Sequence, residues 1–265
     1  MDSAAVLQAF NVQVRQSTRP DGTGAVLQQD GAVVRRVAAR GQDEDRPSGS
    51  GVLWSDLDPG TAEAVIAAQV AFFGGRGEEF EWKLYSYDQP PDLAARLLAA
   101  GFVPEEAEAL MVAEVSRVPQ PAQLPAGIRL ERVTDASGID QLAEVHQRVF
   151  GQDESGLHAT LLAQLGTAPE MIEMVLAMAG DEAVSAARIE FVPGSDFAGL
   201  WGGGTLPAWR GRGIYRALVG YRAALAAERG YRYLQVDASP DSRPILERIG
   251  FSCLAITTPY IWSPG

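Results

Sequence analysis

A loop rich in glycine and arginine, Trp209–Arg216 (WRGRGIYR), separates a predicted strand from a predicted helix. The strand is the apolar, glycine-containing run Phe197–Leu206. After the loop, apolar residues recur at helical spacing over 214–225, and Gly230 is a typical helix stop. Because a strand and a helix each bury an apolar face, this order requires helices packed against a sheet.

The start of this helix is suited to bind an anion. The first turn of a helix has backbone N–H groups without intrahelical partners, and the helix dipole favours negative charge there. Gly211 and Gly213 have no Cβ atom, so an anion can approach the backbone closely. Arg210, Arg212 and Arg216 add cationic donors, and each charge-assisted bond contributes about 1.5–3 kcal/mol. The loop therefore predicts a pyrophosphate site.

Two common phosphate-binding motifs are absent from this loop. A mononucleotide loop of the Walker type requires Gly-Lys-Ser or Gly-Lys-Thr, and the sequence has neither triplet. A dinucleotide loop requires a third glycine in the first turn of the helix, where this chain has Ile214, Tyr215 and Arg216. Binding of another nucleotide pyrophosphate remains a separate hypothesis.

The loop resembles the coenzyme A loop of the GNAT (N-acetyltransferase) superfamily, Arg/Gln-x-x-Gly-x-Gly/Ala. Arg210 and Gly213 match its first and fourth positions. Tyr215 departs from the family, because a small residue usually occupies that position. Its backbone N–H can still bind a phosphate oxygen, provided that the ring points away from the pyrophosphate.

The chain downstream of the loop strengthens this resemblance. Tyr231–Ala238 predicts a buried strand, and Ser239–Phe251 predicts a short helix that ends in Gly-Phe. The last residues predict one or two further strands. This order is the usual ending of a GNAT domain, and the resemblance extends over about Ile128–Trp262. It implies a mixed sheet with covering helices, of the α/β (α+β) class.

The resemblance implies that acetyl-CoA is the acyl donor, bound by the loop and by the end of the preceding strand. A backbone N–H near Leu206 is expected to face the thioester oxygen, as in an oxyanion hole. The implied cofactor-binding residues are Thr205, Leu206, Arg210, Gly211, Arg212, Gly213, Ile214, Tyr215 and Arg216.

Three successive glycines, Gly202, Gly203 and Gly204, interrupt the strand ahead of the loop. They indicate a β-bulge or a close approach of the ligand to the backbone. Close packing under Trp201 or Trp209 is the other interpretation, and the sequence alone leaves both open.

The chemistry implied by the family is attack of a neutral amine on the thioester within a ternary complex. An amine with a pKa of about 10.4 holds its proton at pH 7, and its removal costs about 4–5 kcal/mol. A general base or a water relay is therefore expected. Glu190 is the candidate base, with a surface carboxylate as the alternative. Asp237 either borders the cleft or caps the next helix, and His146 lies on a helix face.

The general acid of the family is a tyrosine on the last helix, and this chain has Leu246 at that position. Ser239 stands where the family usually has an asparagine. A thiol with a pKa of about 8.5 is a fair leaving group unaided. Otherwise Tyr260 or Ser242 is expected to supply the proton. The catalytic candidates are thus Glu190, Tyr260 and Ser239.

Composition argues against several classes of protein. No run approaches about eighteen apolar residues, so no membrane span is expected, and the first residues lack the basic region of a signal peptide. One cysteine and two histidines argue against a metal site and indicate a reducing, cytoplasmic compartment. The net charge of −12 argues against nucleic acid as a partner. We expect a cytoplasmic monomer or homodimer.

The first half of the chain contains a sequence similar to one in the second half. Trp82–Phe102 aligns without gaps on Tyr231–Phe251, with 6 identical residues. Where the second half has the arginine loop, the first half has Asp56–Glu63 (DLDPGTAE), which is acidic and repels a pyrophosphate. The N-terminal half therefore resembles a shortened, degenerate GNAT-like copy, with chance similarity as the alternative.

We therefore predict a degenerate GNAT-like domain at 1–118, a linker at 119–127 and an acetyl-CoA-binding GNAT domain at 128–265. Each domain is expected to have a mixed sheet flanked by helices. The predicted function is acetyl transfer from acetyl-CoA to a primary amine of a small molecule or peptide. Because Leu246 replaces the tyrosine, the alternative is a non-catalytic regulatory protein that binds acyl-CoA. The sequence has no signature of the acceptor.

Overall fold

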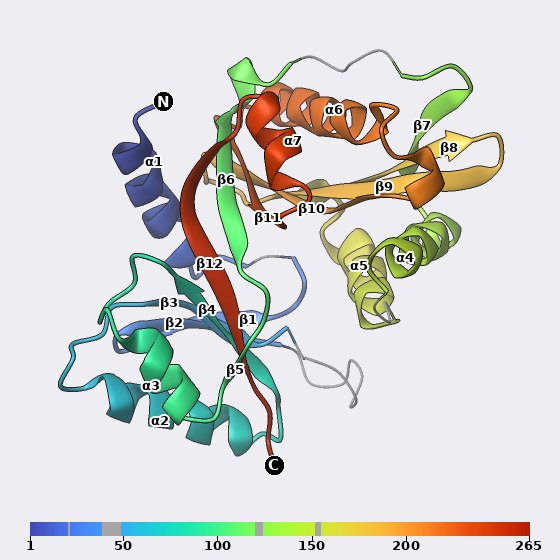
Figure 1. Cartoon of the computed structure of the whole chain (residues 1–265). Coiled ribbons are helices and arrows are strands. Elements are labelled where there is room, and N and C mark those ends of the chain that lie inside the picture. Colours follow the sequence, from blue (N-terminus) through green and yellow to red (C-terminus); the bar gives the residue numbers. More distant parts are fainter. Residues whose placement is uncertain (21, 39–48, 120–123, 152–154) are drawn as a thin grey trace.

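The computed structural model describes residues 1–20, 22–38, 49–119, 124–151 and 155–265. In these residues, twelve strands form one mixed sheet with helices on both faces (Figure 1). The expected mixed α/β architecture is confirmed. The prediction of a separate sheet in each half is wrong, because the strands of both halves pair with one another in a single sheet. Residues 120–123 of the predicted linker lie outside the described residues. No helix in the described ranges is long and apolar enough to span a membrane.

The elements predicted around the arginine loop occur in the predicted order, and the structure adds α1, β1 and β2 near the N-terminus. The elements of the N-terminal half are α1 (Ser3–Phe10), β1 (Val26–Asp30), β2 (Val33–Val37), β3 (Gly51–Ser55), α2 (Ala62–Gly74), β4 (Phe80–Tyr85), α3 (Leu93–Ala99), β5 (Val103–Pro104) and β6 (Glu108–Glu114). Those of the C-terminal half are β7 (Ile128–Val133), α4 (Ala136–Phe150), α5 (Ser155–Thr167), β8 (Ile172–Ala179), β9 (Glu182–Phe191), β10 (Phe197–Thr205), α6 (Ile214–Glu228), β11 (Tyr233–Ala238), α7 (Arg243–Arg248) and β12 (Ser252–Trp262).

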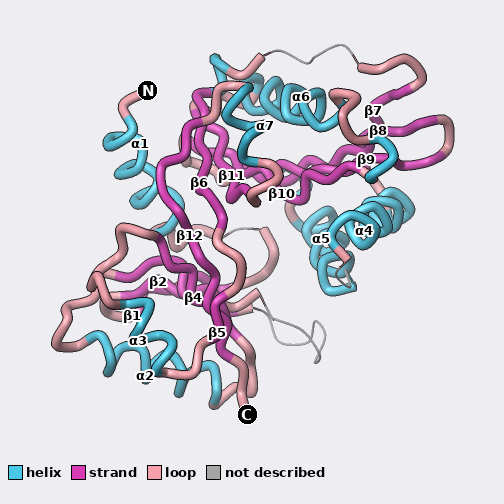
Figure 2. Tube along the Cα trace, in the orientation of Figure 1, coloured by secondary structure: helices cyan, strands magenta, loops and turns pink. Residues whose placement is uncertain are grey.

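The two halves exchange strands at the centre of the sheet. The strand order is β1-β2-β3-β4-β12-β6-β11-β10-β9-β8-β7, and β5 pairs with β12. The last strand of the chain, β12, lies beside β4 of the N-terminal half, whereas β6 of the N-terminal half lies beside β11. Figures 1 and 2 show β12 and β6 running along each other between the two halves. Each half therefore depends on a strand of the other for its backbone hydrogen bonds.

The central pairing also relates the two similar sequences. The order β3-α2-β4-α3-β5 in the first half corresponds to β10-α6-β11-α7-β12 in the second. Glu108 on β6 is the partner of Thr257 on β12. Glu108 and Thr257 are separated by the same number of residues as Trp82 and Tyr231, so they are also equivalent positions in the sequence alignment. The pairing of β6 with β12 is thus consistent with an internal repeat and with an approximate twofold relation between its copies.

The helices divide between the two faces of the sheet. On one face, α6 and α7 pack over β6, β9, β10 and β11, in a core that contains Met111 and Leu246. On the other face, α4 and α5 pack over β8 and β9 around Ile139. On that second face, α1 covers the junction of the halves, where Phe10 contacts a core that includes Tyr233. The part of the junction around Leu110 and Tyr233 is therefore covered on both faces.

A buried ion pair fixes the segment that follows α1. Arg15 is 3% exposed, and its Nη1 and Nη2 atoms donate to Asp88 Oδ1 and Oδ2 at 2.8 Å each. Arg15 Nε donates to the Leu53 carbonyl at 3.1 Å, and Asp88 Oδ2 accepts the Tyr85 N–H at 2.9 Å. The pair joins the N-terminal segment to β3 and β4. A buried, bidentate pair is costly to break because either charge alone remains desolvated.

Removal of the Asp88 carboxylate should therefore destabilise the protein strongly. We expect Asp88→Ala to lower the free energy of unfolding in urea by about 3–5 kcal/mol, because Arg15 stays buried without its partner. Asp92→Ala is the matched control, since Asp92 pairs with Arg96 on the exposed side of α3. Equal losses in the two variants would contradict a structural role for the buried pair.

Candidate active site at the start of α6

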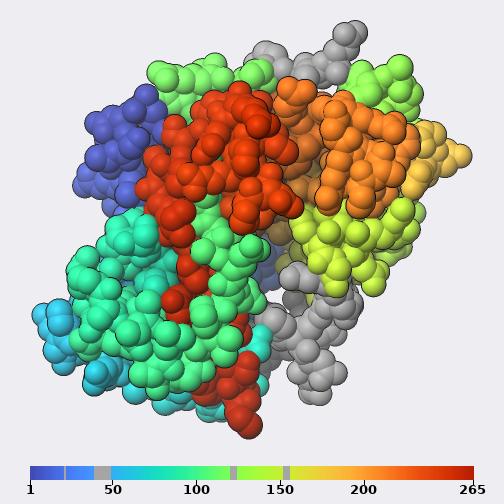
Figure 3. Space-filling model, viewed as in Figure 1, coloured from blue at the N-terminus to red at the C-terminus, as the bar shows by residue number. Residues whose placement is uncertain are grey.

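A cavity of about 890 Å³ opens where the end of β10 meets the starts of α6 and α7, with the end of α4 beside it. Its walls include Thr205, Arg210, Arg216, Ser239 and Phe150. In the space-filling view, α6 (orange) and α7 (red) lie side by side, with yellow-green atoms of the α4 region below α6 (Figure 3). The cavity therefore lies at the loop that the sequence predicts to bind an anion.

The backbone of this loop leaves the first turn of α6 open. Gly211 and Gly213 adopt left-handed φ values of 74° and 86°, which glycine accepts without strain. A Cβ atom on Gly211 would meet nothing within 4 Å. No side chain caps α6, so its first N–H groups keep their capacity to bind a ligand. Arg210 is fixed beside them, because its Nε donates to the Thr205 carbonyl at 3.0 Å.

Most of the predicted cofactor-binding residues line this cavity, and two do not. Those in its walls are Thr205, Arg210, Gly211, Gly213, Ile214, Tyr215 and Arg216. Leu206 is buried outside it, and its N–H donates to the Val184 carbonyl at 2.9 Å. That N–H is therefore not available to a thioester oxygen, contrary to the expectation. Arg212 lies over the Trp209 ring at 4.6 Å and donates to the Ala208 carbonyl.

A β-bulge interrupts β10 just before the cavity. Trp201 pairs with Arg188 and Gly204 with Ala186, so Gly202 and Gly203 stand opposite the single residue between them on β9. Gly202 has a φ of 56°. On its other edge, β10 pairs with β11 only from Phe197 to Gly199. Beyond Gly199 the two parallel strands are no longer paired, and the bulge residues Gly202 and Gly203 lie in this part of β10.

His146 on α4 holds the bulge from one face of the sheet. Its Nε2 lies 2.6 Å from the Gly202 carbonyl oxygen, and a carbonyl can only accept, so Nε2 carries the hydrogen. His146 is 2% exposed, and burial, with a smaller contribution from Arg188, lowers its pKa to about 4. The imidazole is therefore neutral at pH 7 and acts as a hydrogen-bond donor through Nε2.

Arg222 on α6 supports the neighbouring backbone from the opposite face. Its Nη1 donates to the Arg188 carbonyl at 3.0 Å, and its Nε donates to the Leu218 carbonyl at 3.1 Å. The side chain is 1% exposed, and burial lowers its pKa to about 10. Among the described residues, no carboxylate lies within ion-pair distance of it. Burial of a cation costs free energy, so the hydrogen bonds of Arg222 to the backbone beside the bulge indicate that it stabilises this distorted part of the sheet.

The three glycines of β10 each make room for a different side chain. A Cβ on Gly202 would overlap the His146 ring, and one on Gly203 would lie 3.0 Å from Tyr215 Cε2. A Cβ on Gly204 would lie 2.9 Å from Val149 Cγ1. The glycines thus serve both the bulge and close packing, although their neighbours are not Trp201 and Trp209. Gly203 explains how the chain accepts Tyr215 where the family has a small residue.

The three catalytic candidates have different positions. Ser239 lines the cavity, with its Oγ 3.2 Å from Ser242 Oγ. Tyr260 lies in the core of the N-terminal half, beside Trp82, and this position does not agree with protonation of a thiolate at the α6 loop. Glu190 is outside the cavity walls and pairs with Arg188 at 3.1 Å, so the predicted general base is already engaged.

Sequence reasoning placed His146 on a helix face without its role in the bulge, and it missed Arg222. His146 follows Leu142 and Val145 on the apolar face of α4, and Arg222 lies between Val219 and Ala223 on that of α6. A polar side chain within the apolar face of a helix was the available signal, because burial of such a group requires a hydrogen-bond partner. The partner itself, a carbonyl freed by a bulge, is visible only in the fold.

The contact between Gly202 and His146 predicts a specific loss of stability. Gly180 is a matched control, because its φ of 61° is similar and a Cβ there would meet nothing within 4 Å. Gly180→Ala should cost about 1–2 kcal/mol from backbone strain alone. We expect Gly202→Ala to cost about 1–3 kcal/mol more, from the overlap with the imidazole. Urea unfolding measures both, and equal losses would show that the ring does not occupy this place.

Comparison with known proteins places this site in a family. Residues 139–251 match the model of the acetyltransferase (GNAT) family. This segment contains α4, the bulge, the arginine loop, α6 and α7. No curated protein sequence is significantly similar to the chain.

Several solved structures share the fold over nearly the whole chain. A GCN5-related N-acetyltransferase from Kribbella flavida has a TM-score of 0.69 at 18% identity, covering 100% of this chain and 96% of that one. A tandem GNAT protein from the clavulanic acid biosynthesis pathway has a TM-score of 0.62 at 14% identity, covering 99% and 95%. A GCN5-related N-acetyltransferase from Sphaerobacter thermophilus has a TM-score of 0.60 at 19% identity, covering 88% and 78%. The cavity, its loop and its bulge thus belong to a domain of the GNAT acetyltransferase family at residues 139–251.

Proposed function

We propose that the protein transfers an acetyl group from acetyl-CoA to a primary amine of a small molecule or peptide, by direct attack within a ternary complex. The observation that carries this proposal is the uncapped start of α6, which lines a cavity of about 890 Å³ together with Arg210 and Arg216. The family assignment of residues 139–251 supports acyl transfer.

The residues of the cavity fit the chemical groups of acetyl-CoA. The first N–H groups of α6 and the Arg216 guanidinium suit the pyrophosphate, because both favour anionic oxygens. Arg210 shapes the loop through its bond to Thr205. The gap between β10 and β11 beyond Gly199 offers unpaired backbone to the amide groups of the pantetheine arm. When bound, acetyl-CoA supplies an activated acyl group.

The bulge supplies the electrostatic part of the mechanism. In a trans peptide the C=O of one residue and the N–H of the next point in opposite directions. Because His146 holds the Gly202 carbonyl on its own side, the Gly203 N–H is directed away from His146. We assign this N–H, in place of the one near Leu206, to the negative charge that develops on the thioester oxygen. Arg222 keeps the opposite strand fixed at Arg188.

We assign proton transfer to groups other than His146, because a pKa of about 4 makes its imidazole a weak base. Its Nε2 already donates to Gly202, so this nitrogen has no free lone pair for the amine. Ser239 and Ser242 lie together in the cavity wall and can relay a proton through water. Leu246 is fully buried in the core beneath α7, and the thiolate, with a pKa of about 8.5 for its thiol, can leave without a dedicated acid.

The position of the arginines predicts which of them bind the donor. Arg216 lines the cavity, whereas Arg212 lies over Trp209. Acetyl-CoA should raise the melting temperature of the wild-type protein. Arg216→Gln should weaken its binding about tenfold in calorimetry, since one charge-assisted bond contributes about 1.5–3 kcal/mol. Arg212→Gln is the control and should bind within about twofold of wild type.

Two results would contradict this proposal in different ways. If wild-type protein shows neither a thermal shift nor a heat of binding with acetyl-CoA, the assignment of the donor is wrong. If acetyl-CoA binds but a broad panel of amines releases no free CoA, the protein is a non-catalytic binder of acyl-CoA.

The bulge can be tested spectroscopically without an acceptor amine. A hydrogen bond from a backbone N–H polarises the thioester carbonyl, so binding of carbonyl-labelled acetyl-CoA should lower its infrared stretching frequency. His146→Leu removes the donor to Gly202 and should abolish this shift. His146→Gln can still donate but cannot act as a base, so it should retain the shift.

Turnover should follow the same pattern in these two variants. A misplaced catalytic group commonly costs about 100-fold in rate, and we expect a loss of that order in His146→Leu. His146→Gln should keep most of the activity and the pH profile. Loss of activity in both variants, with the infrared shift intact, would instead make His146 a general base.

A further inference from the structure

A cluster of four charged side chains and one threonine bridges the two halves on the face of the sheet opposite α6. It consists of Glu81 and Lys83 on β4, Thr257 on β12, Glu108 on β6 and Asp237 on β11. The sheet register places all five on one face, because Thr257 is the partner of both Tyr85 and Glu108, and Leu110 is the partner of Asp237. We call this group the junction cluster.

One lysine stands among three carboxylates in the junction cluster. Lys83 Nζ lies 3.0 Å from Asp237 Oδ2, 3.4 Å from Glu108 Oε2 and 4.0 Å from Glu81 Oε1. In a flat sheet, three strand spacings of about 4.8 Å would separate β4 from β11 by ~14 Å. Lys83 therefore extends across β12 and β6 to reach Asp237, so the cluster spans the junction of the two halves.

The negative charge of the cluster exceeds what Lys83 can balance. Burial raises the pKa of the Glu81 and Glu108 carboxyls; Lys83 opposes this rise, while Asp237 and Glu105 add to it. Burial would lower the pKa of Lys83, but the carboxylates raise it, so the lysine stays charged. Three carboxyl groups and one lysine give the cluster a formal excess of negative charge, and a further cation beside it would stabilise the ionised carboxylates against burial.

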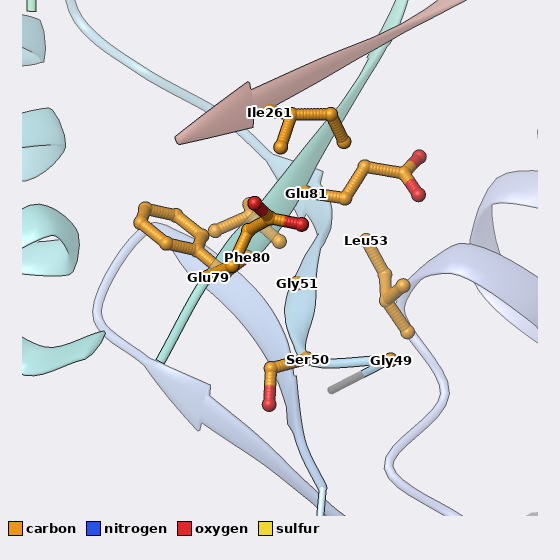
Figure 4. A pocket seen from close by; sticks show the side chains of 9 residues that line it. Gly49, Ser50, Gly51, Leu53, Glu79, Phe80, Glu81 and Ile261 are labelled. Carbon is orange, nitrogen blue, oxygen red and sulfur yellow. The ribbon is translucent and has the colours of Figure 1, made fainter. Parts of the chain in front are cut away.

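Three buried oxygen atoms of the cluster have no hydrogen-bond partner among the described residues. They are Asp237 Oδ1, Glu81 Oε1 and Thr257 Oγ1. Thr257 is fully buried, and the Asp237 side chain is only 8% exposed. Unpaired acceptors in such places are costly and indicate a ligand with N–H or O–H donors. A small cavity of about 110 Å³ reaches the cluster at Glu81, whose carboxylate points away from Phe80 (Figure 4).

The cluster lies next to the candidate active site. Asp237 is two residues before Ser239, which lines the cavity of the α6 loop. The gap between β10 and β11 opens directly after Gln235, the last residue of β11 that pairs with β10. A molecule bound at Asp237 is therefore close along β11 both to the start of this gap and to Ser239 in the cavity wall.

The side chains of the cluster suit an organic ammonium ion better than a metal ion. In the described residues, no three His, Cys, Asp or Glu side chains converge closely enough to hold a metal ion. An ammonium group has three donors and a positive charge, which match the unpaired acceptors and the net charge. Carboxylates stabilise the protonated form of an amine, whereas the amine that attacks a thioester must be neutral. The bound ammonium is therefore not the reacting group.

We propose that the junction cluster binds a second, non-reacting ammonium group of the acceptor, so that the substrate is an amine with at least two amino groups. This inference rests on the proposed acetyl transfer. It gives the N-terminal half a role, since that half supplies Glu81, Lys83 and Glu108 to the site.

The experiment compares linear diamines, from diaminopropane to diaminoheptane, with the monoamines of equal chain length. In wild-type protein saturated with CoA, at least one diamine should bind in calorimetry at least tenfold more tightly than its monoamine. With acetyl-CoA, that diamine should have a correspondingly higher kcat/KM. Asp237→Asn and Glu108→Gln should each reduce the diamine preference to less than threefold and leave acetyl-CoA binding unchanged. Glu114→Gln is the control, because Glu114 lies on the same strand as Glu108 but pairs with Arg117.

Three outcomes would overturn the proposal. They are the absence of diamine binding, equal binding of diamines and monoamines, and a diamine preference that persists in both cluster variants. Circular dichroism identifies a variant that fails to fold, in which case the other variant decides. Failure of the proposed function is a different result, since wild-type protein would then bind no acetyl-CoA.

Discussion

The pairing of β6 with β12 is the interaction on which the rest of the structure depends. A strand edge without a partner exposes backbone donors and acceptors, and each half of this chain would have such an edge alone. The edges of β4 and β11 are instead covered by β12 and β6, each contributed by the other half. The same exchange brings Lys83 into contact with Asp237, so the junction cluster is a direct consequence of strand order.

The second constraint is the bulge in β10. An extra residue in a strand frees backbone groups that a regular ladder would satisfy. Here the Gly202 carbonyl is paired by His146 and the Arg188 carbonyl by Arg222, from opposite faces of the sheet. Both side chains are almost fully buried, which costs free energy unless their bonds are maintained. The distortion is therefore held in place from two independent helices, as a preorganised site requires.

The spacing of residues along the chain predicted the helices and strands that form the site. It could not predict the contacts between segments that lie far apart in the sequence. The loop, β10, α6 and the Gly-Phe junction before β12 follow from glycine, proline and apolar spacing, which act within a few residues. Tyr260 was misplaced because the partner of β12 is not encoded locally. It lies eight residues along β12 from Ser252, roughly 27 Å away at the usual strand rise, and enters the other half. His146 and Arg222 show the same limit, since their partner atoms exist only in the folded backbone.

The two corresponding turns explain why the halves differ in their capacity for an anion. In the N-terminal half, the Asp58 carboxylate accepts the Gly60 N–H at 2.8 Å, and the Asp58 carbonyl accepts the N–H groups of Thr61 and Ala62. These donors at the start of α2 are thus satisfied within the chain, beside a fixed negative charge. At the start of α6 no side chain occupies the equivalent place, and Arg216 adds a positive charge. The two turns therefore differ in charge and in the backbone donors that remain open, so the sequence difference between the two loops has a direct structural meaning.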